Sequence, residues 1–213
     1  MHAAHKIISL NNIESSSYKK LSDEDLMLLF QDGDEGAYNE LVRRYKNRIC
    51  AFICGMLNDY DMAQDLTQDT LFKLYTHKNS YKNIAKFSTW LYTIAKNMSY
   101  TELRKKSRRK TYSISDIDPD SNSNISYFQN IESDHYRHES SNIGDQRKYR
   151  YDKKILRKKI SELPEEFKSI ILLRDIQELS YDMVSKIMEL PIGTVKSRLN
   201  RARIKLKELL EGE

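Results

Sequence analysis

Apolar residues recur at steps of three and four along most of this chain, the spacing that one face of an α-helix requires. The clearest run starts after Asp34 and comprises Ala37, Leu41, Val42, Tyr45, Ile49, Phe52, Ile53 and Met56. Each helical run in this part of the chain starts with a residue that can cap a helix N-terminus. Asp34 precedes the run just described, Ser22 precedes the run before it, and Asp59 precedes the run after it. The pattern predicts helices starting at Ser22, at Asp34, at Asp59 (ending near His77) and near Ser88.

Composition divides the chain into four pieces. Residues 1–20 are polar, and we expect a flexible tail there. Residues 112–149 are rich in Ser, Asn and Asp, and their sparse apolar residues show no period, which is typical of a flexible acidic linker. Residues 21–111 and 150–213 carry the helical pattern, and only six Gly and three Pro interrupt the whole sequence. The expected fold class is all-α, with two small helical domains joined by the linker.

The chemically reactive residues do not form a recognisable catalytic or metal site. The five His are scattered, and we find no glycine-rich phosphate loop and no nucleophile arrangement, so we expect no enzyme activity, metal or cofactor. Cys50 and Cys54 lie one helical turn apart in an apolar run and are predicted to be buried thiols. The sequence has neither a bilayer-spanning apolar run nor a signal core, which predicts a cytoplasmic protein without membrane insertion.

Residues 180–211 predict a short helix, a tight turn and a second, longer helix, the arrangement of a helix-turn-helix. On the second helix, one apolar seam comprises Val195, Leu199, Ala202, Leu206 and Leu209. The remaining face is basic and hydroxylic, and such side chains contact phosphates and base edges in the DNA major groove. The candidate residues are Thr194, Lys196, Ser197, Arg198, Asn200, Arg201 and Lys205. We therefore expect the C-terminal domain to read duplex DNA.

The helix that starts near Ser88 combines aromatic and basic side chains on one face. A loop with polar and basic residues precedes it, and six of the seven residues from Arg104 to Lys110 are basic. Aromatic rings stack on unpaired bases while cations follow the phosphates, which favours single-stranded DNA as the ligand. The candidate residues are Asn83, Lys86, Phe87, Trp90, Asn97, Tyr100 and Arg104. For Trp90, a place in the core is an equally good interpretation.

Acidic and amide side chains line the helix that follows Asp59. They are Asp61, Gln64, Asp65, Gln68 and Asp69, and Phe72 follows them. Acidic residues do not face DNA, so this stripe indicates a protein partner with a basic surface. Solvated helix charges are the alternative interpretation.

Three segments, taken together and in this order, resemble the extracytoplasmic-function (ECF) sigma factors, which give bacterial RNA polymerase its promoter specificity. They are DLTQDTLFKLY at 65–75, FSTWLYTIAKN at 87–97, and LPEEF at 163–167 with GTVKSRL at 193–199. The resemblance covers about residues 21–107 and 150–211. Departures occur at Gln64, where the family usually has an acid, and at Leu71-Phe72, which reverses a common order. Ser185 and Glu189 replace a frequent Ala and a frequent Gly.

This resemblance implies a role for each candidate surface. The acidic stripe with Phe72 would dock on core RNA polymerase, residues 80–104 would bind the melted minus-10 element, and the second domain would read the minus-35 element. The resemblance also implies an anti-sigma protein as a partner. It does not imply an enzyme.

Two other functions remain open from the residues alone. A helix-turn-helix regulator that binds duplex DNA without polymerase needs neither the acidic helix nor the aromatic face. A helical interaction protein that mimics a sigma factor needs no DNA contacts. Transcription by core polymerase with the purified chain distinguishes the sigma factor from both.

Overall fold

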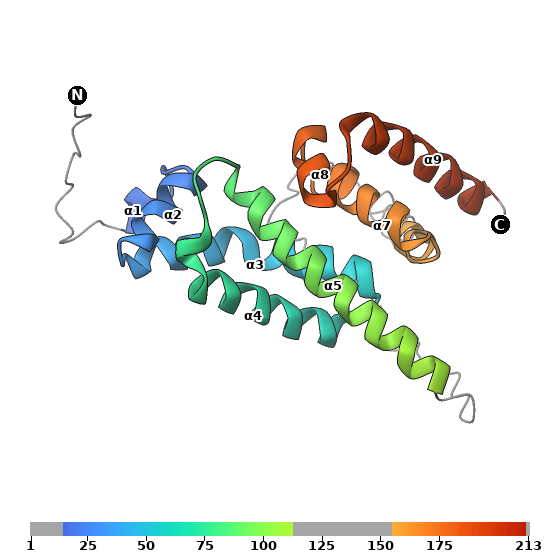
Figure 1. The fold of residues 1–213 in the computed structure, drawn as a ribbon, viewed down its shortest axis with the longest axis horizontal. Coiled ribbons are helices and arrows are strands. Elements are labelled where there is room, and N and C mark those ends of the chain that lie inside the picture. The colour runs from blue at the N-terminus through green and yellow to red at the C-terminus, as the bar shows by residue number, and fades with distance from the viewer. Residues whose placement is uncertain (1–14, 113–154, 212–213) are drawn as a thin grey trace, which may run out of the picture.

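The computed structural model describes residues 15–112 and 155–211, and every regular element in these two ranges is a helix (Figure 1). The predicted all-α class is therefore confirmed. The N-terminal group comprises α1 (Ser15–Tyr18), α2 (Asp23–Gln31), α3 (Glu35–Leu57), α4 (Tyr60–Thr76), the 3-10 turn η1 (Lys78–Ser80) and α5 (Phe87–Tyr112). The C-terminal group comprises a helix over 155–161, α7 (Glu165–Ile171), the π-helical segment η3 (Leu172–Ile176), α8 (Tyr181–Met188) and α9 (Ile192–Glu211).

Side-chain caps start α2, α3 and α4 where the sequence predicted them. Ser22 Oγ, Asp34 Oδ1 and Asp59 Oδ1 each accept a hydrogen bond from the backbone N–H three residues later, at 3.1 Å. Each bond satisfies a donor that the first helical turn leaves without a partner, and contributes about 1 kcal/mol. The start of α5 lies one residue before the expected one, and its end lies well beyond Arg104. The basic stretch therefore belongs to the helix.

Helix α3 is the centre of the N-terminal group and packs against α2, α4 and α5. Its predicted apolar stripe is buried throughout, apart from Val42, which is half-buried. Cys50 and Cys54 are free thiols within this core, as predicted. Burial raises the pKa of both thiols, that of Cys54 to about 12, so that neither is a reactive thiolate at neutral pH. No helix in the described ranges is long and apolar enough to cross a membrane.

The expected flexible tail over 1–20 is wrong at its C-terminal end. Residues 1–14 lie outside the described part of the chain, but α1 packs against α3. The Tyr18 hydroxyl donates to the Asp34 carboxylate at 3.0 Å, and Arg44 Nη2 donates to the carbonyls of Tyr18 and Lys19 at 2.9 and 3.1 Å. A guanidinium presents several donors in a fixed plane, which lets one side chain fix a polar segment that lacks an apolar stripe.

The two helical groups are in contact with each other. Helix α8 packs against α5, while α7 and η3 pack against α3, as Figure 1 shows on one side of α5. The buried apolar side chains of both groups belong to one continuous cluster. The expected linker over 112–149 lies outside the described residues except for Tyr112, which ends α5.

Candidate nucleic-acid and protein interfaces

Helices α8 and α9 form the predicted helix-turn-helix. Ser180 Oγ caps α8 by accepting from the Met183 N–H at 3.2 Å, and Glu189 ends it in the left-handed region with φ of 57°. Ser185 Oγ donates to the Leu190 carbonyl across the turn at 2.5 Å. Ser185 and Glu189 thus both shape this turn. Glycine adopts a positive φ without steric cost, whereas Glu189 adopts it with some strain.

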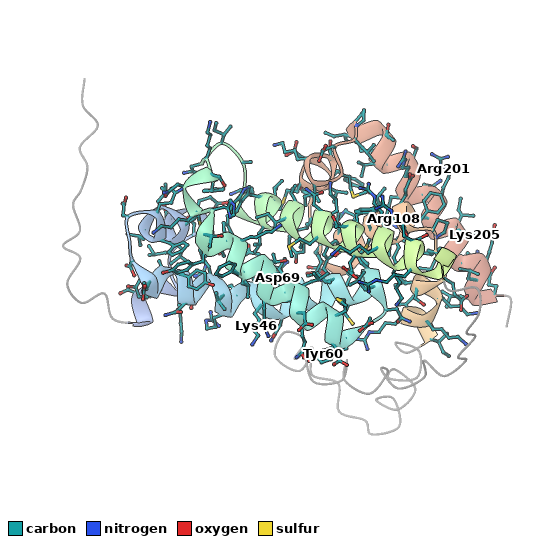
Figure 2. The ribbon with its side chains drawn as sticks, turned by 60° about the horizontal axis from the view of Figure 1, so that its bottom comes forward. Lys46, Tyr60, Asp69, Arg108, Arg201 and Lys205 are labelled. Atoms are coloured by element: carbon teal, nitrogen blue, oxygen red, sulfur yellow. The ribbon has the colours of Figure 1, made fainter. Side chains whose placement is uncertain are left out.

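The outer face of α9 is basic and accessible. Its seam is buried at Val195, Leu199 and Ala202 and half-buried further on. The exposed candidate residues are Lys196, Ser197, Asn200, Arg201 and Lys205, whereas Thr194 and Arg198 are half-buried. Figure 2 shows Arg201 and Lys205 pointing outward from α9.

Two of these basic side chains already have a partner within the chain. Arg198 Nη1 donates to the Glu166 carboxylate at 2.6 Å, and Lys205 Nζ lies 3.0 Å from the Glu208 carboxylate. Both pairs are at the surface, where an ion pair contributes little and phosphate oxygens can compete for the cation. Arg201 has an exposed guanidinium and is the strongest candidate for reading a base edge.

The predicted aromatic face on α5 exists only in part. Phe87 is completely buried and packs edge-to-face against Tyr45, at 5.2 Å between ring centroids, so its predicted place on the DNA-binding surface is wrong in this conformation. From the sequence, an aromatic side chain in the first turn of a helix can lie either in the core or at the surface. Phe87 lies in the core because its neighbours there are apolar. Trp90 is half-buried against Tyr81, with 5.6 Å between the ring centroids. Asn97 is exposed.

Tyr100 faces the second domain rather than open solvent. Its hydroxyl lies 3.0 Å from Ser169 Oγ, and Ser169 Oγ itself donates to the Glu165 carbonyl at 2.8 Å, so Tyr100 donates to Ser169. Burial raises the pKa of Tyr100. Beyond it, α5 exposes a run of cations, namely Arg104, Lys105, Lys106, Arg108 and Arg109. Figure 2 labels Arg108 in this part of α5.

The loop before α5 borders a pocket of about 220 Å³. Its lining residues are Glu24, Asn83, Ile84, Ala85, Lys86 and Lys186. The structure therefore brings the predicted residues Asn83 and Lys86 together, and it adds Glu24 from α2 and Lys186 from α8, which sequence reasoning missed. Glu24 Oε1 accepts from the Phe87 N–H at 3.0 Å and thereby fixes the end of the loop. Glu24 and Lys186 lie far from Asn83 and Lys86 in the sequence, so no local sequence pattern could have indicated these contacts.

Helix α4 presents the predicted acidic stripe to solvent. All six candidate residues are exposed: Asp61, Gln64, Asp65, Gln68, Asp69 and Phe72. The opposite face is buried through Leu66, Thr67, Thr70, Leu71 and Leu74. Phe72 is 65% exposed although phenyl groups favour burial. The surface combines negative charge with one large apolar group, which suits a basic protein partner with an apolar contact site. Figure 2 shows Tyr60 and Asp69 of α4 far from Arg201.

Comparisons with known proteins agree with this arrangement. The family description "Sigma-70 region 2" matches residues 41–109, and "Sigma-70, region 4" matches residues 153–206. The ECF RNA polymerase sigma-E factor of Escherichia coli (strain K12) is 32% identical over 185 residues, which cover 87% of this chain and 92% of that protein. The ECF RNA polymerase sigma factor SigW of Bacillus subtilis (strain 168) is 30% identical over 178 residues, which cover 84% of this chain and 91% of that protein.

Two solved structures have a similar fold. The sigma factor RpoE in complex with the anti-sigma factor NepR from Bartonella quintana matches with a TM-score of 0.61 and 25% identity, over 82% of this chain and 96% of that one. CnrH in complex with the cytosolic domain of CnrY matches with a TM-score of 0.63 and 17% identity, over 90% of this chain and 98% of that one. The second match concerns the fold alone. The chain belongs to the ECF family of RNA polymerase sigma factors.

Proposed function

We propose that this sigma factor docks on core RNA polymerase through α4 and contacts a promoter at two separate places. Residues 21–111 would form the unit that binds polymerase and the melted minus-10 element, and residues 150–213 the unit that reads the minus-35 element. The observation that carries the proposal is that one chain exposes an acidic helix with an apolar tip and two basic helical surfaces. A regulator that binds duplex DNA alone has no use for the first of these surfaces.

Each surface supplies a different interaction. The carboxylates of α4 would pair with cations of the polymerase, while Phe72 would enter an apolar contact. Arg201 and Asn200 would contact base edges in the major groove, and Lys196 and Lys205 would contact phosphates. The cations that follow Tyr100 on α5 would hold the backbone of the separated strand, with the pocket beside Asn83 and Lys86 taking an unpaired base.

The proposal also has implications for catalysis and for the location of the protein in the cell. Formation of phosphodiester bonds belongs to the polymerase, so we infer no catalytic role for the chain itself. Polymerase and chromosome share the bacterial cytoplasm, which we infer to be its location. The RpoE match was solved with the anti-sigma factor NepR, and we infer an anti-sigma protein as a partner of this chain too.

The test is transcription by purified core polymerase on a library of bacterial promoter templates, with and without the purified chain. Transcripts that start only in the presence of the chain are the expected result. The variant Asp65→Ala with Asp69→Ala should lower the yield by about twofold to thirtyfold, because each of the two exposed ion pairs of a docking surface contributes roughly 0.2–1 kcal/mol.

A matched control removes two exposed carboxylates elsewhere, with Asp32→Ala and Glu35→Ala. It should retain the parent yield, since it changes the net charge equally. Failure of the parent chain to start any transcript contradicts the proposal. Equal yields from both double variants contradict the assignment of α4.

A further inference from the structure

Residues 81–86 form an irregular loop between η1 and α5, and this loop carries side chains that we assign to the unpaired base. Ile84 at its tip is 88% exposed, and Asn83 and Lys86 are exposed as well. Within the loop, the Ile84 N–H donates to the Lys82 carbonyl at 2.7 Å, which shapes the tip alone. An irregular segment without a helical or sheet ladder adopts one shape only when neighbouring elements hold it.

Helix α2 holds this loop at both ends. Gln31, its last residue, donates through Nε2 to the carbonyls of Lys78 and Tyr81 at 2.7 and 3.0 Å. Glu24, its second residue, accepts from the Phe87 N–H through Oε1 at 3.0 Å. The two side chains are seven positions apart, close to two helical turns, so they lie on one face of α2, about 10 Å apart along its axis. One rigid element therefore fixes both the start and the end of the loop.

These contacts satisfy backbone groups that have no partner in a helix. Phe87 begins α5, and the first N–H groups of a helix lack an acceptor within it. The Glu24 carboxylate supplies that acceptor, and its negative charge suits the positive end of the helix dipole. Between the two ends, the Tyr81 hydroxyl donates to the Ala85 carbonyl at 2.9 Å. An aliphatic side chain at position 24 or 31 would leave the corresponding end of the loop without its bond to α2.

Helix α2 is itself fixed to α3 beside Glu24. The Asp23 carboxylate accepts from Arg44 Nη1 at 2.7 Å and from the Tyr45 hydroxyl at 2.5 Å. The Tyr45 ring also packs against the ring of Phe87, where the loop ends. A side chain whose own support is locked in this way holds its partner more precisely than one on a mobile element. The contacts thus run from α3 through α2 to the loop.

We propose that Glu24 and Gln31 are positioning residues, which hold loop 81–86 in the shape that receives the unpaired base before DNA arrives. The proposal deepens the proposed function and rests on it, because it concerns the same binding site. Gln31 acts through the backbone of the loop, since it does not line the pocket beside Asn83 and Lys86. A loop that is already ordered loses less conformational entropy when its ligand binds, so capture of the base depends on both contacts.

The test combines each variant with the loss of one base from the promoter. Holoenzyme is reconstituted from core polymerase and the full chain, and the template is a promoter that it transcribes, opened beforehand by mismatches over the minus-10 element. Single abasic sites are placed in turn along each opened strand, and the yield of transcript is measured. With the parent chain, one abasic position should lower the yield about tenfold, because the loop then has no base to bind.

We expect Glu24→Ala and Gln31→Met to lower the yield on the intact template about tenfold, and the abasic site to have almost no further effect in either variant. Glu24→Gln keeps an acceptor for the Phe87 N–H and should restore both values. Asp25→Ala is the matched control, because it removes an equal charge from the same turn of α2, at an exposed side chain that accepts from Ser22. It should behave as the parent does.

A role in folding alone gives a different pattern, since a loss of stability lowers the yield by the same factor with and without the abasic site. Such independent losses overturn the proposal, as does a Glu24→Gln variant that behaves like Glu24→Ala. A parent chain for which no abasic position matters overturns it too. Gln31→Met supplies the same comparison from the other end of the loop if Glu24→Ala does not fold.

Failure of the proposed function is distinguishable from failure of this inference. If the proposed function is wrong, the parent chain starts no transcript from any template, and the positioning role is refuted with it. If only the positioning role is wrong, the parent chain supports transcription with its sensitive position, and the variants leave the ratio of yields between intact and abasic templates unchanged.

Discussion

Phe72 on α4 gives the sharpest test of polymerase docking, because its side chain is exposed to solvent without contributing much to the core. It is 65% exposed, and a phenylalanine side chain can bury roughly 200 Å². About 130 Å² is then free for a partner, and at about 25 cal/mol per Å² its full burial contributes about 3 kcal/mol. We therefore expect Phe72→Ala to weaken binding to core polymerase on the order of 100-fold.

The measurement is a titration of dye-labelled protein with core polymerase, followed by fluorescence anisotropy. The free energy of unfolding in urea should fall by no more than about 2 kcal/mol, because only about a third of the Phe72 side chain, roughly 70 Å², is buried in the folded chain. Leu28→Ala is the matched control, because Leu28 is another large apolar side chain that is 40% exposed, but on α2. Parent-like affinity of Phe72→Ala would show that α4 does not carry the contact.

Three further predictions concern DNA binding and stability. Arg201→Ala should weaken binding to a minus-35 duplex by about 1–3 kcal/mol and relax one base-pair position, whereas an equal loss on random duplexes would mean a phosphate contact only. Glu40 is 7% exposed and its pKa is lowered to about 2 by hydrogen bonds from Arg43 and, less strongly, from Arg44. Because the folded pKa lies below the unfolded one, this stabilisation is complete above about pH 5 and is lost as the pH falls toward 2. Glu40→Gln should therefore cost about 2–3 kcal/mol in urea unfolding at neutral pH and much less near pH 2, and a pH-independent cost would refute the linkage. In a Lys96→Met background, where the 3.4 Å contact between the Lys96 ammonium and the Glu189 carboxylate is absent, Glu189→Gly should raise the unfolding free energy by about 0.5–1 kcal/mol by relieving the left-handed φ. An unchanged or lower value in calorimetry would contradict the strain.

Local signals in the sequence were sufficient for the helices and their starts. A capping side chain and the N–H that it satisfies lie within four residues of each other, so Ser22, Asp34 and Asp59 could be identified without any tertiary information. The exposed stripe of α4 and the buried seam of α9 follow from periodicity in the same way. These are the parts of the candidate interfaces that the sequence predicted well.

Helix α5 shows why the remainder could not be predicted. Its periodicity indicates one buried face with Leu91 and Ala95, yet Tyr92 and Lys96 are buried as well. Tyr92 is buried because it packs on Phe52 of α3 and donates to Gln177, and Lys96 is buried because α8 covers it. The carbonyl that accepts from Lys96 lies about 90 positions away in the sequence. Periodicity reports which side chains avoid water, but it does not report a lysine that is buried through a hydrogen bond to a distant carbonyl.

The basic end of α5 has a consequence for the proposed contact between this helix and DNA. Arg104 and Arg108, and likewise Lys105 and Arg109, stand four residues apart, and all four side chains are exposed. Like charges at this spacing weaken an isolated helix by about 0.2–0.5 kcal/mol per pair. Phosphates alongside remove the repulsion, so these last turns should gain helicity as the nucleic acid arrives. Slower hydrogen exchange of the backbone amides in these turns would then report binding of the chain to a promoter.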